Sequence, residues 1–115
     1  MIPQSEGDLK KIVNDYLQYQ QNQGKLWFTR LNCGSAFVKK GGRSYAIELS
    51  EEGTADFIVI KRNCLLEYTD VLFIELKSAT GRSSPAQQAF KVIVENQGAR
   101  YETIRSFEEL EELLK

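Results

Sequence analysis

Near the start of the chain, apolar positions recur with the period of a helix. Residues 5–21 place five apolar side chains on one helical face: Leu9, Ile12, Val13, Tyr16 and Leu17. Ser5 followed by Asp8 is typical of a helix start, and the polar residues 22–24 end the pattern. The sequence therefore predicts an amphipathic first helix.

Shorter apolar runs predict the strands of a sheet. One strand is expected at 26–31, and the following residues 32–53, rich in glycine, serine and charge, predict either a loop or a loose hairpin. Residues 56–60 and 71–77 are expected to be adjacent antiparallel strands. The second of them is apolar on both faces up to Leu76, which indicates a sheet covered on both sides.

The C-terminal part of the chain predicts a helix and a parallel strand. Residues 84–96 have helical character, with Pro85 suited to the first turn and Gly98 suited to the C-terminal end. Residues 99–104 follow as a strand. The helix at 84–96 connects strand 71–77 to this strand. Such a connection is expected to be a right-handed crossover between parallel strands.

The complete pattern predicts one domain over residues 1–115, because a chain of this length can bury a sufficient core. A short acidic helix, capped by Ser106 and ending at Leu113 and Leu114, completes it. The resulting order αβ(β)ββαβα predicts an α/β fold of the α+β type, with a mixed sheet and helices on both faces.

Composition adds limits rather than chemistry. A hydrophobic share of 42% and a charged share of 27% are those of an ordinary folded protein. The N-terminus turns polar at once, and no apolar run approaches the roughly 18 residues needed to span a bilayer. We therefore expect no membrane partner and a cytoplasmic protein.

Histidine is absent, and Cys33 and Cys64 are the only cysteines. One chain therefore cannot build a zinc site with four Cys or His ligands, and its thiols are expected to be reduced and inert. Ser-His-Asp and Cys-His catalysis are excluded as well. An enzyme with this sequence must work with carboxylates, lysine and a hard metal ion.

The net charge of −1 conceals an uneven distribution. Residues 25–45 contain no acidic residue but carry Lys25, Arg30, Lys39, Lys40 and Arg43. This stretch is either a basic surface for nucleic acid or a solvated loop with scattered charges.

Three ionisable residues occur at the ends of the two central strands. Asp56 opens one strand, while Glu75 and Lys77 end its neighbour on one face. Antiparallel pairing would bring them together, and two close carboxylates favour a cation such as Mg²⁺ or Mn²⁺ between them. Lys77 would then hold or activate a water molecule opposite a phosphate. The alternative is an ordinary ion pair on a strand.

These residues occur within a longer pattern that resembles the PD-(D/E)XK nuclease superfamily, and within it the virus-type replication-repair nuclease (VRR-NUC) domain. The matching residues are Gly53, Asp56, Glu75, Lys77, Gly81, Arg82, Ser84, Pro85 and Gln87. Towards the N-terminus the resemblance continues through Ser5, Glu6, Arg30, Asn32 and Gly34. Ser83 and Phe90 depart from the family's usual apolar residue and tryptophan, and residues 35–52 match nothing.

The resemblance implies a restriction-endonuclease-like αβββαβ core and a Mg²⁺- or Mn²⁺-dependent DNA endonuclease. It implies metal ligands at Glu6, Asp56, Glu75 and the backbone carbonyl of Leu76. Catalytic roles fall on Asp56, Glu75, Lys77 and Gln87. The expected substrate is DNA, with branched or four-way junctions favoured, in a bacterial or phage-infected cell. The alternatives are a catalytically weak nucleic-acid-binding or interaction module on the same fold, and an exonuclease with the same site that admits DNA ends.

Several of these residues have a second interpretation. Glu6 in a first helical turn also favours the helix dipole, and Ser84 with Gln87 forms a capping box without any substrate. We expect DNA contacts from Arg30, Lys39, Lys40, Arg43, Arg82 and Lys91, although Arg82 and Lys91 are also compatible with ordinary surface charges.

Assembly is predicted from the surplus of aromatic residues. Symmetrical cleavage of a junction needs two sites, and a twofold dimer supplies them. The candidate interface residues are Trp27, Phe28, Phe37, Tyr45 and Tyr68. We expect a homodimer, with the alternative that these side chains belong to the core.

Overall fold

The computed structural model describes residues 5–31, 35–48, 53–63 and 65–115. Within these ranges the chain forms a mixed α/β fold, which confirms the fold class predicted from the sequence. Its helices and strands, in chain order, are α1 (Glu6–Asn22), β1 (Trp27–Arg30), β2 (Ser35–Lys40), β3 (Arg43–Glu48), β4 (Phe57–Asn63), β5 (Tyr68–Leu76), α2 (Pro85–Asn96), β6 (Arg100–Ile104) and α3 (Phe107–Leu113).

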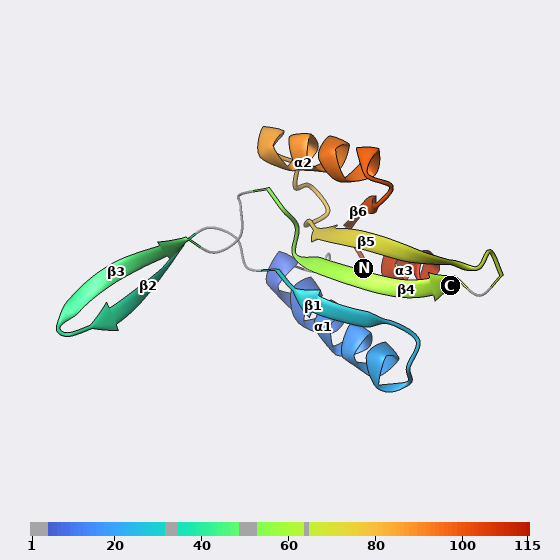
Figure 1. Cartoon of the computed structure of the whole chain (residues 1–115), viewed down its shortest axis with the longest axis horizontal. Helices are drawn as coiled ribbons and strands as arrows, with labels where there is room; N and C mark the ends of the chain where they lie inside the picture. Colours follow the sequence, from blue (N-terminus) through green and yellow to red (C-terminus); the bar gives the residue numbers. More distant parts are fainter. Residues whose placement is uncertain (1–4, 32–34, 49–52, 64) are drawn as a thin grey trace.

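Four strands form one mixed sheet in the order β1-β4-β5-β6 (Figure 1). β4 is antiparallel to both β1 and β5, whereas β6 is parallel to β5. Both predicted pairings of strand 71–77 are therefore confirmed. In the register of β4 and β5, Phe57 pairs with Ile74. In the same register, Asp56, the residue before β4, lies opposite Glu75.

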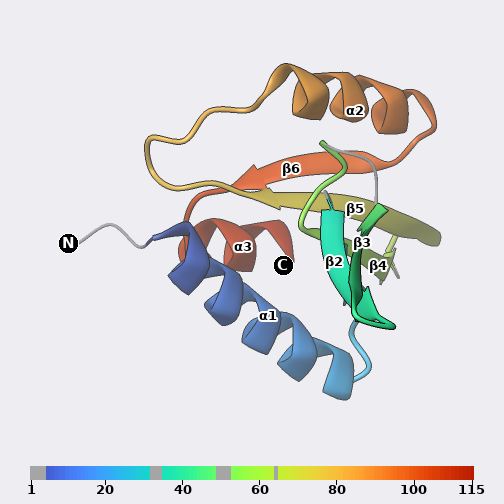
Figure 2. The ribbon, with the colours of Figure 1, turned by 90° about the vertical axis from the view of Figure 1, so that its left-hand side faces the viewer.

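Helices cover both faces of the sheet, as predicted: α1 and α3 lie on one face and α2 lies on the other (Figure 2). The larger core forms beneath α1 and α3, because the apolar stripe of α1 packs against alternate residues of the strands. Its buried members include Leu9, Val13, Leu17, Phe28, Phe57, Val59, Leu72, Ile74, Leu76 and Leu110.

The face beneath α2 is only partly covered. Val94 of α2 and Tyr101 of β6 are buried there, with Phe73 and Phe90 packed against them. Trp27 keeps half of its surface exposed. α2 therefore shields β5 and β6 more completely than β1.

Side-chain caps fix where the helices begin. The Ser5 hydroxyl accepts a hydrogen bond from the backbone amide of Asp8, and the Ser106 hydroxyl accepts one from Glu109. Ser84 and Gln87 form the complete capping box of α2. These contacts satisfy amides that have no partner within the helix. All three predicted helix starts are thus confirmed.

β2 and β3 pair with each other as an antiparallel hairpin. Of the two predictions for this part of the chain, a loop or a loose hairpin, the hairpin is confirmed. Its turn consists of Gly41 and Gly42, both with positive φ, which is the requirement of a two-residue type I′ turn. Figure 1 shows the hairpin extending away from the four-stranded sheet. Among the described helices, none combines the length and apolar character needed to cross a membrane.

Candidate active site

Three carboxylates meet at the end of the sheet where β4 begins and β5 ends. Glu6 comes from the first turn of α1, Asp56 precedes β4, and Glu75 lies near the end of β5. One oxygen from each lies within 4.8 Å of the others. Asp56 and Glu75 are buried, with 9% and 6% of their surfaces exposed, while Glu6 is exposed. In Figure 2 the start of α1 and the loop entering α2 lie at this end.

Asp56 is held by two partners of different kinds. Its Oδ2 accepts a hydrogen bond of 2.7 Å from the backbone amide of Leu76, and its Oδ1 lies 3.1 Å from Nζ of Lys10. Lys10 was not predicted from the sequence. The available signal was its spacing, since it follows Glu6 by four residues and shares its helical face. The contact from Leu76 involves the amide, and ligation by its carbonyl remains a prediction.

Glu75 is less well compensated than Asp56. Its Oε1 accepts a hydrogen bond of 2.9 Å from Gln87, but Nζ of Lys77 lies 3.8 Å away. Burial, reinforced by the charge of Asp56 and opposed by that of Lys77, raises the pKa of Glu75 to about 7. The cluster therefore retains a proton at pH values where an ordinary glutamate is ionised, and a bound cation would replace that proton.

The surroundings of Lys10 shift its pKa in opposite directions. Burial lowers its pKa, but the hydrogen bond and charge of Asp56 outweigh burial, so that the pKa of Lys10 is raised. It therefore remains a cation beside the carboxylates.

Gln87 closes the capping box of α2, as one reading of the sequence predicted, and it also contacts Glu75. Its Oε1 accepts a hydrogen bond from the Ser84 amide, which closes the capping box, while its Nε2 donates to Glu75. The cap fixes the rotamer that presents the amide to the carboxylate. A structural role and a contact within the site are therefore compatible in one side chain.

Arg105 holds the loop between β5 and α2 in place, and Gly53 allows a close approach to the backbone of α2. Nη1 of Arg105 donates hydrogen bonds of 2.7 Å to the carbonyls of Ser78 and Gly81, in the loop between β5 and α2. Gly53 has a φ of +88°, and a Cβ at this position would lie 2.6 Å from the carbonyl carbon of Ala86. Sequence reasoning missed Arg105, because no local pattern links it to a loop more than twenty residues away.

Tyr101 lies on the same sheet face as Glu75, beneath α2. Its hydroxyl is buried and has no hydrogen-bond partner among the described residues, although buried polar groups are normally paired. Burial, followed by the charges of Glu75 and Asp56, raises the pKa of Tyr101. Tyr101 is therefore a neutral phenol at ordinary pH, near enough to the carboxylates to feel their field.

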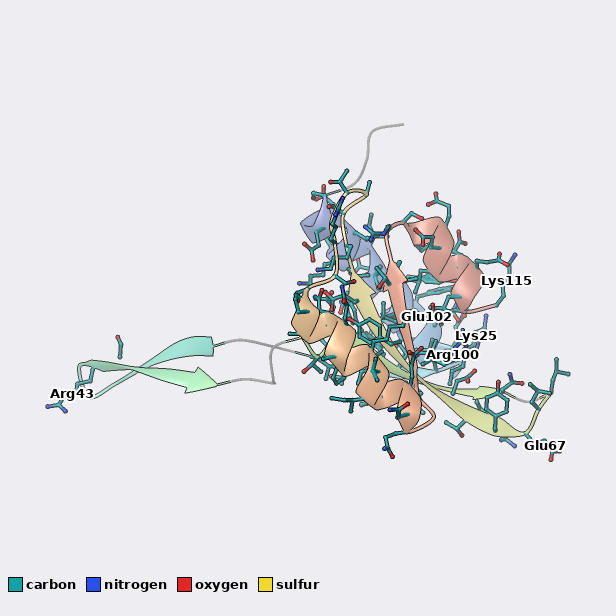
Figure 3. The ribbon with its side chains drawn as sticks, turned by 90° about the horizontal axis from the view of Figure 1, so that it is seen from above. Lys25, Arg43, Glu67, Arg100, Glu102 and Lys115 are labelled. Atoms are coloured by element: carbon teal, nitrogen blue, oxygen red, sulfur yellow. The ribbon has the colours of Figure 1, made fainter. Side chains whose placement is uncertain are left out.

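The predicted DNA-binding cations are distributed unevenly around the site. Arg30 lies beside it, where it lines a hollow together with Lys10. Arg82 is exposed in the loop that leads into α2, and Lys91 is exposed on α2 itself. Arg43 lies at the tip of the hairpin, far from the sheet (Figure 3). The side chains of Lys39 and Lys40 lie outside what the structure describes.

Of the five aromatic residues expected at a dimer interface, the structure describes the side chains of three. Phe28 is buried against Phe57 in the core, so its assignment to an interface was wrong. Trp27 and Tyr68 are about half exposed. The side chains of Phe37 and Tyr45 lie outside the described residues, as do Asn32 and Gly34 of the family pattern.

Comparison with known proteins gives no match to a family model, to a curated protein or to a solved structure. The resemblance to the VRR-NUC domain therefore rests on its motif residues alone. The donor set itself suits a hard divalent cation, because carboxylate oxygens are the ligands that Mg²⁺ and Mn²⁺ prefer. Burial, and then the charge of Asp56, raise the pKa of Glu75, and a bound cation would favour its ionised form.

Proposed function

We propose that the protein is a Mg²⁺- or Mn²⁺-dependent DNA endonuclease that hydrolyses phosphodiester bonds. The observation that supports it most strongly is the convergence of two buried carboxylates, Asp56 and Glu75, with Glu6 at the same point. Lys77 and Gln87 both contact Glu75. This set corresponds to the motif residues that resemble the VRR-NUC pattern.

Each side chain has a distinct role in this proposal. Glu6, Asp56 and Glu75 hold the cation, assisted by the carbonyl of Leu76. When bound, the cation polarises the phosphodiester and stabilises the charge of the transition state. Lys77 orients the attacking water, and Gln87 keeps Glu75 in place through a hydrogen bond of 2.9 Å.

We further propose that the substrate is branched or four-way DNA in replication, repair or recombination, and that the active form is a homodimer. Two sites in fixed relation are needed to cut a junction symmetrically, and twofold symmetry provides them. The second candidate is a catalytically weak nucleic-acid-binding module. The presence of Asp56, Glu75 and Lys77 in one cluster favours the enzyme, because binding DNA alone does not require buried carboxylates.

The decisive experiment is a cleavage assay on labelled duplex, flap and four-way DNA, with Mn²⁺ and with a chelator. We expect metal-dependent cleavage that is fastest on the four-way substrate. Light scattering should give twice the 13.1 kDa mass of one chain. Binding without cleavage in Mg²⁺ and Mn²⁺ would favour the binding module. A monomer that cuts linear duplex as well as junctions would remove the junction specificity and leave a general nuclease.

A further inference from the structure

A basic hollow of about 260 Å³ lies beside the carboxylates, and of its lining residues only Arg30 was predicted to contact DNA. It is lined by Gly7, Lys10, Lys11, Asn14 and Arg30. The first four follow one another at the spacing of a single helical face, and Arg30 faces them from the end of β1. The space beside Gly7 is open, since a Cβ at this position would meet nothing within 4 Å.

The charges of this basic hollow are not neutralised within it. Among the described residues, neither Lys11 nor Arg30 has a carboxylate within ion-pair distance, and both side chains are exposed. Lys10 is paired with Asp56 and is close enough to Arg30 for the arginine's charge to lower its pKa. Like charges gathered in this way repel one another unless an anion lies between them.

We propose that the basic hollow binds a backbone phosphate of the DNA strand, next to the phosphate that is cut. The inference rests on the proposed function, because it places the scissile phosphate at the carboxylates. Phosphates follow one another every ~3.4 Å of helix rise along a strand, so neighbouring phosphates can occupy adjoining sites. Lys11, Arg30 and the amide of Asn14 supply hydrogen-bond donors of the kind that contact phosphate oxygens.

Lys10 connects the two sites. Its ammonium group lies 3.1 Å from Asp56 and also lines the basic hollow. A divalent cation held by Asp56 would compete with Lys10 for that carboxylate and would leave the ammonium group available to the phosphate. Binding of the cation and binding of the DNA strand are therefore expected to strengthen each other.

The test is the affinity for a fluorescent 20-base-pair duplex, measured by anisotropy with Ca²⁺ in place of Mg²⁺ and at several salt concentrations. Lys11→Ala and Arg30→Ala should each weaken binding by roughly three- to tenfold and reduce the salt slope by about one. The matched control is Lys115→Ala, which removes an exposed lysine near Arg62, about 20 Å along β4 from Asp56. It should change affinity by less than about twofold. Circular dichroism checks that each variant is folded.

The outcomes separate this inference from the proposed function. Wild-type affinity in Lys11→Ala and Arg30→Ala would overturn the phosphate site even if the protein cleaves DNA. A wild type that binds DNA through these two residues but never cleaves it would support the phosphate site and contradict the nuclease. A wild type that binds neither the duplex nor four-way DNA would overturn the phosphate site.

Discussion

The two ends of the four-stranded sheet both carry ionisable side chains beside a hollow, yet they differ in chemistry. The end where β4 begins holds Asp56 and Glu75, next to a hollow of about 260 Å³. The opposite end, where β4 stops and β5 begins, has a larger hollow than this, of about 380 Å³. Residues that line this larger hollow include Lys61, Arg62, Asp70, Arg100 and Lys115.

At the larger hollow, Arg100 lies near opposite charges and Lys61 has a carbonyl partner. Arg100 lies 3.4 Å from Glu102 (Figure 3) and 3.8 Å from Asp70. Lys61 donates a hydrogen bond to the carbonyl of Leu114. At the other end, Glu75 is buried beside a second carboxylate with its pKa raised to about 7. The difference teaches that buried charge without full compensation, rather than the size of a hollow, distinguishes the candidate active site.

The largest expected effect is on catalysis, which should depend on the carboxylates at one end of the sheet and not on those at the other. Glu75→Gln keeps the shape of the side chain but removes an anionic ligand, so DNA cleavage should fall by about 10³-fold or more. Asp70→Asn is the same change at the opposite end and should leave cleavage within about twofold. Initial rates at saturating Mn²⁺ measure both. Comparable losses in the two variants would show that the ends do not differ as described.

A second effect concerns stability without divalent metal. The folded protein holds the Glu75 proton more tightly than the unfolded chain does, because the pKa rises from an ordinary 4.5 to about 7. The stabilisation from this proton is complete below pH 4.5 and is lost as the pH rises through about 7. It amounts to at most ~3 kcal/mol of the free energy of unfolding.

Urea unfolding in a chelator at pH 5 and pH 8 measures this loss. Glu75→Gln should show a smaller difference between the two pH values, because its amide does not titrate. Asp70→Asn should retain the wild-type difference. An unchanged difference in Glu75→Gln would contradict the assignment of the proton to Glu75.

The smallest effect concerns competition for Asp56. Lys10→Ala removes a cation from the carboxylate, so Mn²⁺ should bind more tightly by about 0.2–1 kcal/mol, which is at most about fivefold. Lys61→Ala removes a lysine at the opposite end and should not alter Mn²⁺ affinity. Calorimetry compares the three proteins. Weaker Mn²⁺ binding in Lys10→Ala would mean that Lys10 supports the metal site instead of competing for it.

Features that depend on neighbouring residues could be predicted from the sequence. The apolar period of α1, the caps at Ser5 and Ser84, and the approach of Asp56 to Glu75 all follow from local patterns and strand pairing. These signals are strong because helix and strand periods differ clearly.

Contacts between distant segments could not be predicted in the same way. Spacing places Lys10 on the helical face of Glu6, but it does not identify Asp56 as the partner of Lys10. No local pattern directs Arg105 to the carbonyls before α2. The burial of Phe28 was equally hidden, since an apolar residue in a four-residue strand fits a core or an interface. Each depends on how α1, β1 and β6 pack in three dimensions.

Gly53 has a consequence for how sequences of this kind can diverge. Its φ is positive, and any side chain there would place its Cβ only 2.6 Å from the backbone of Ala86, so no residue but glycine fits. Glycine at this position, three residues before Asp56, is therefore constrained by architecture and carries no chemistry. Sequences that keep this fold are expected to retain the glycine even where their carboxylates have changed, so its presence alone does not identify an enzyme.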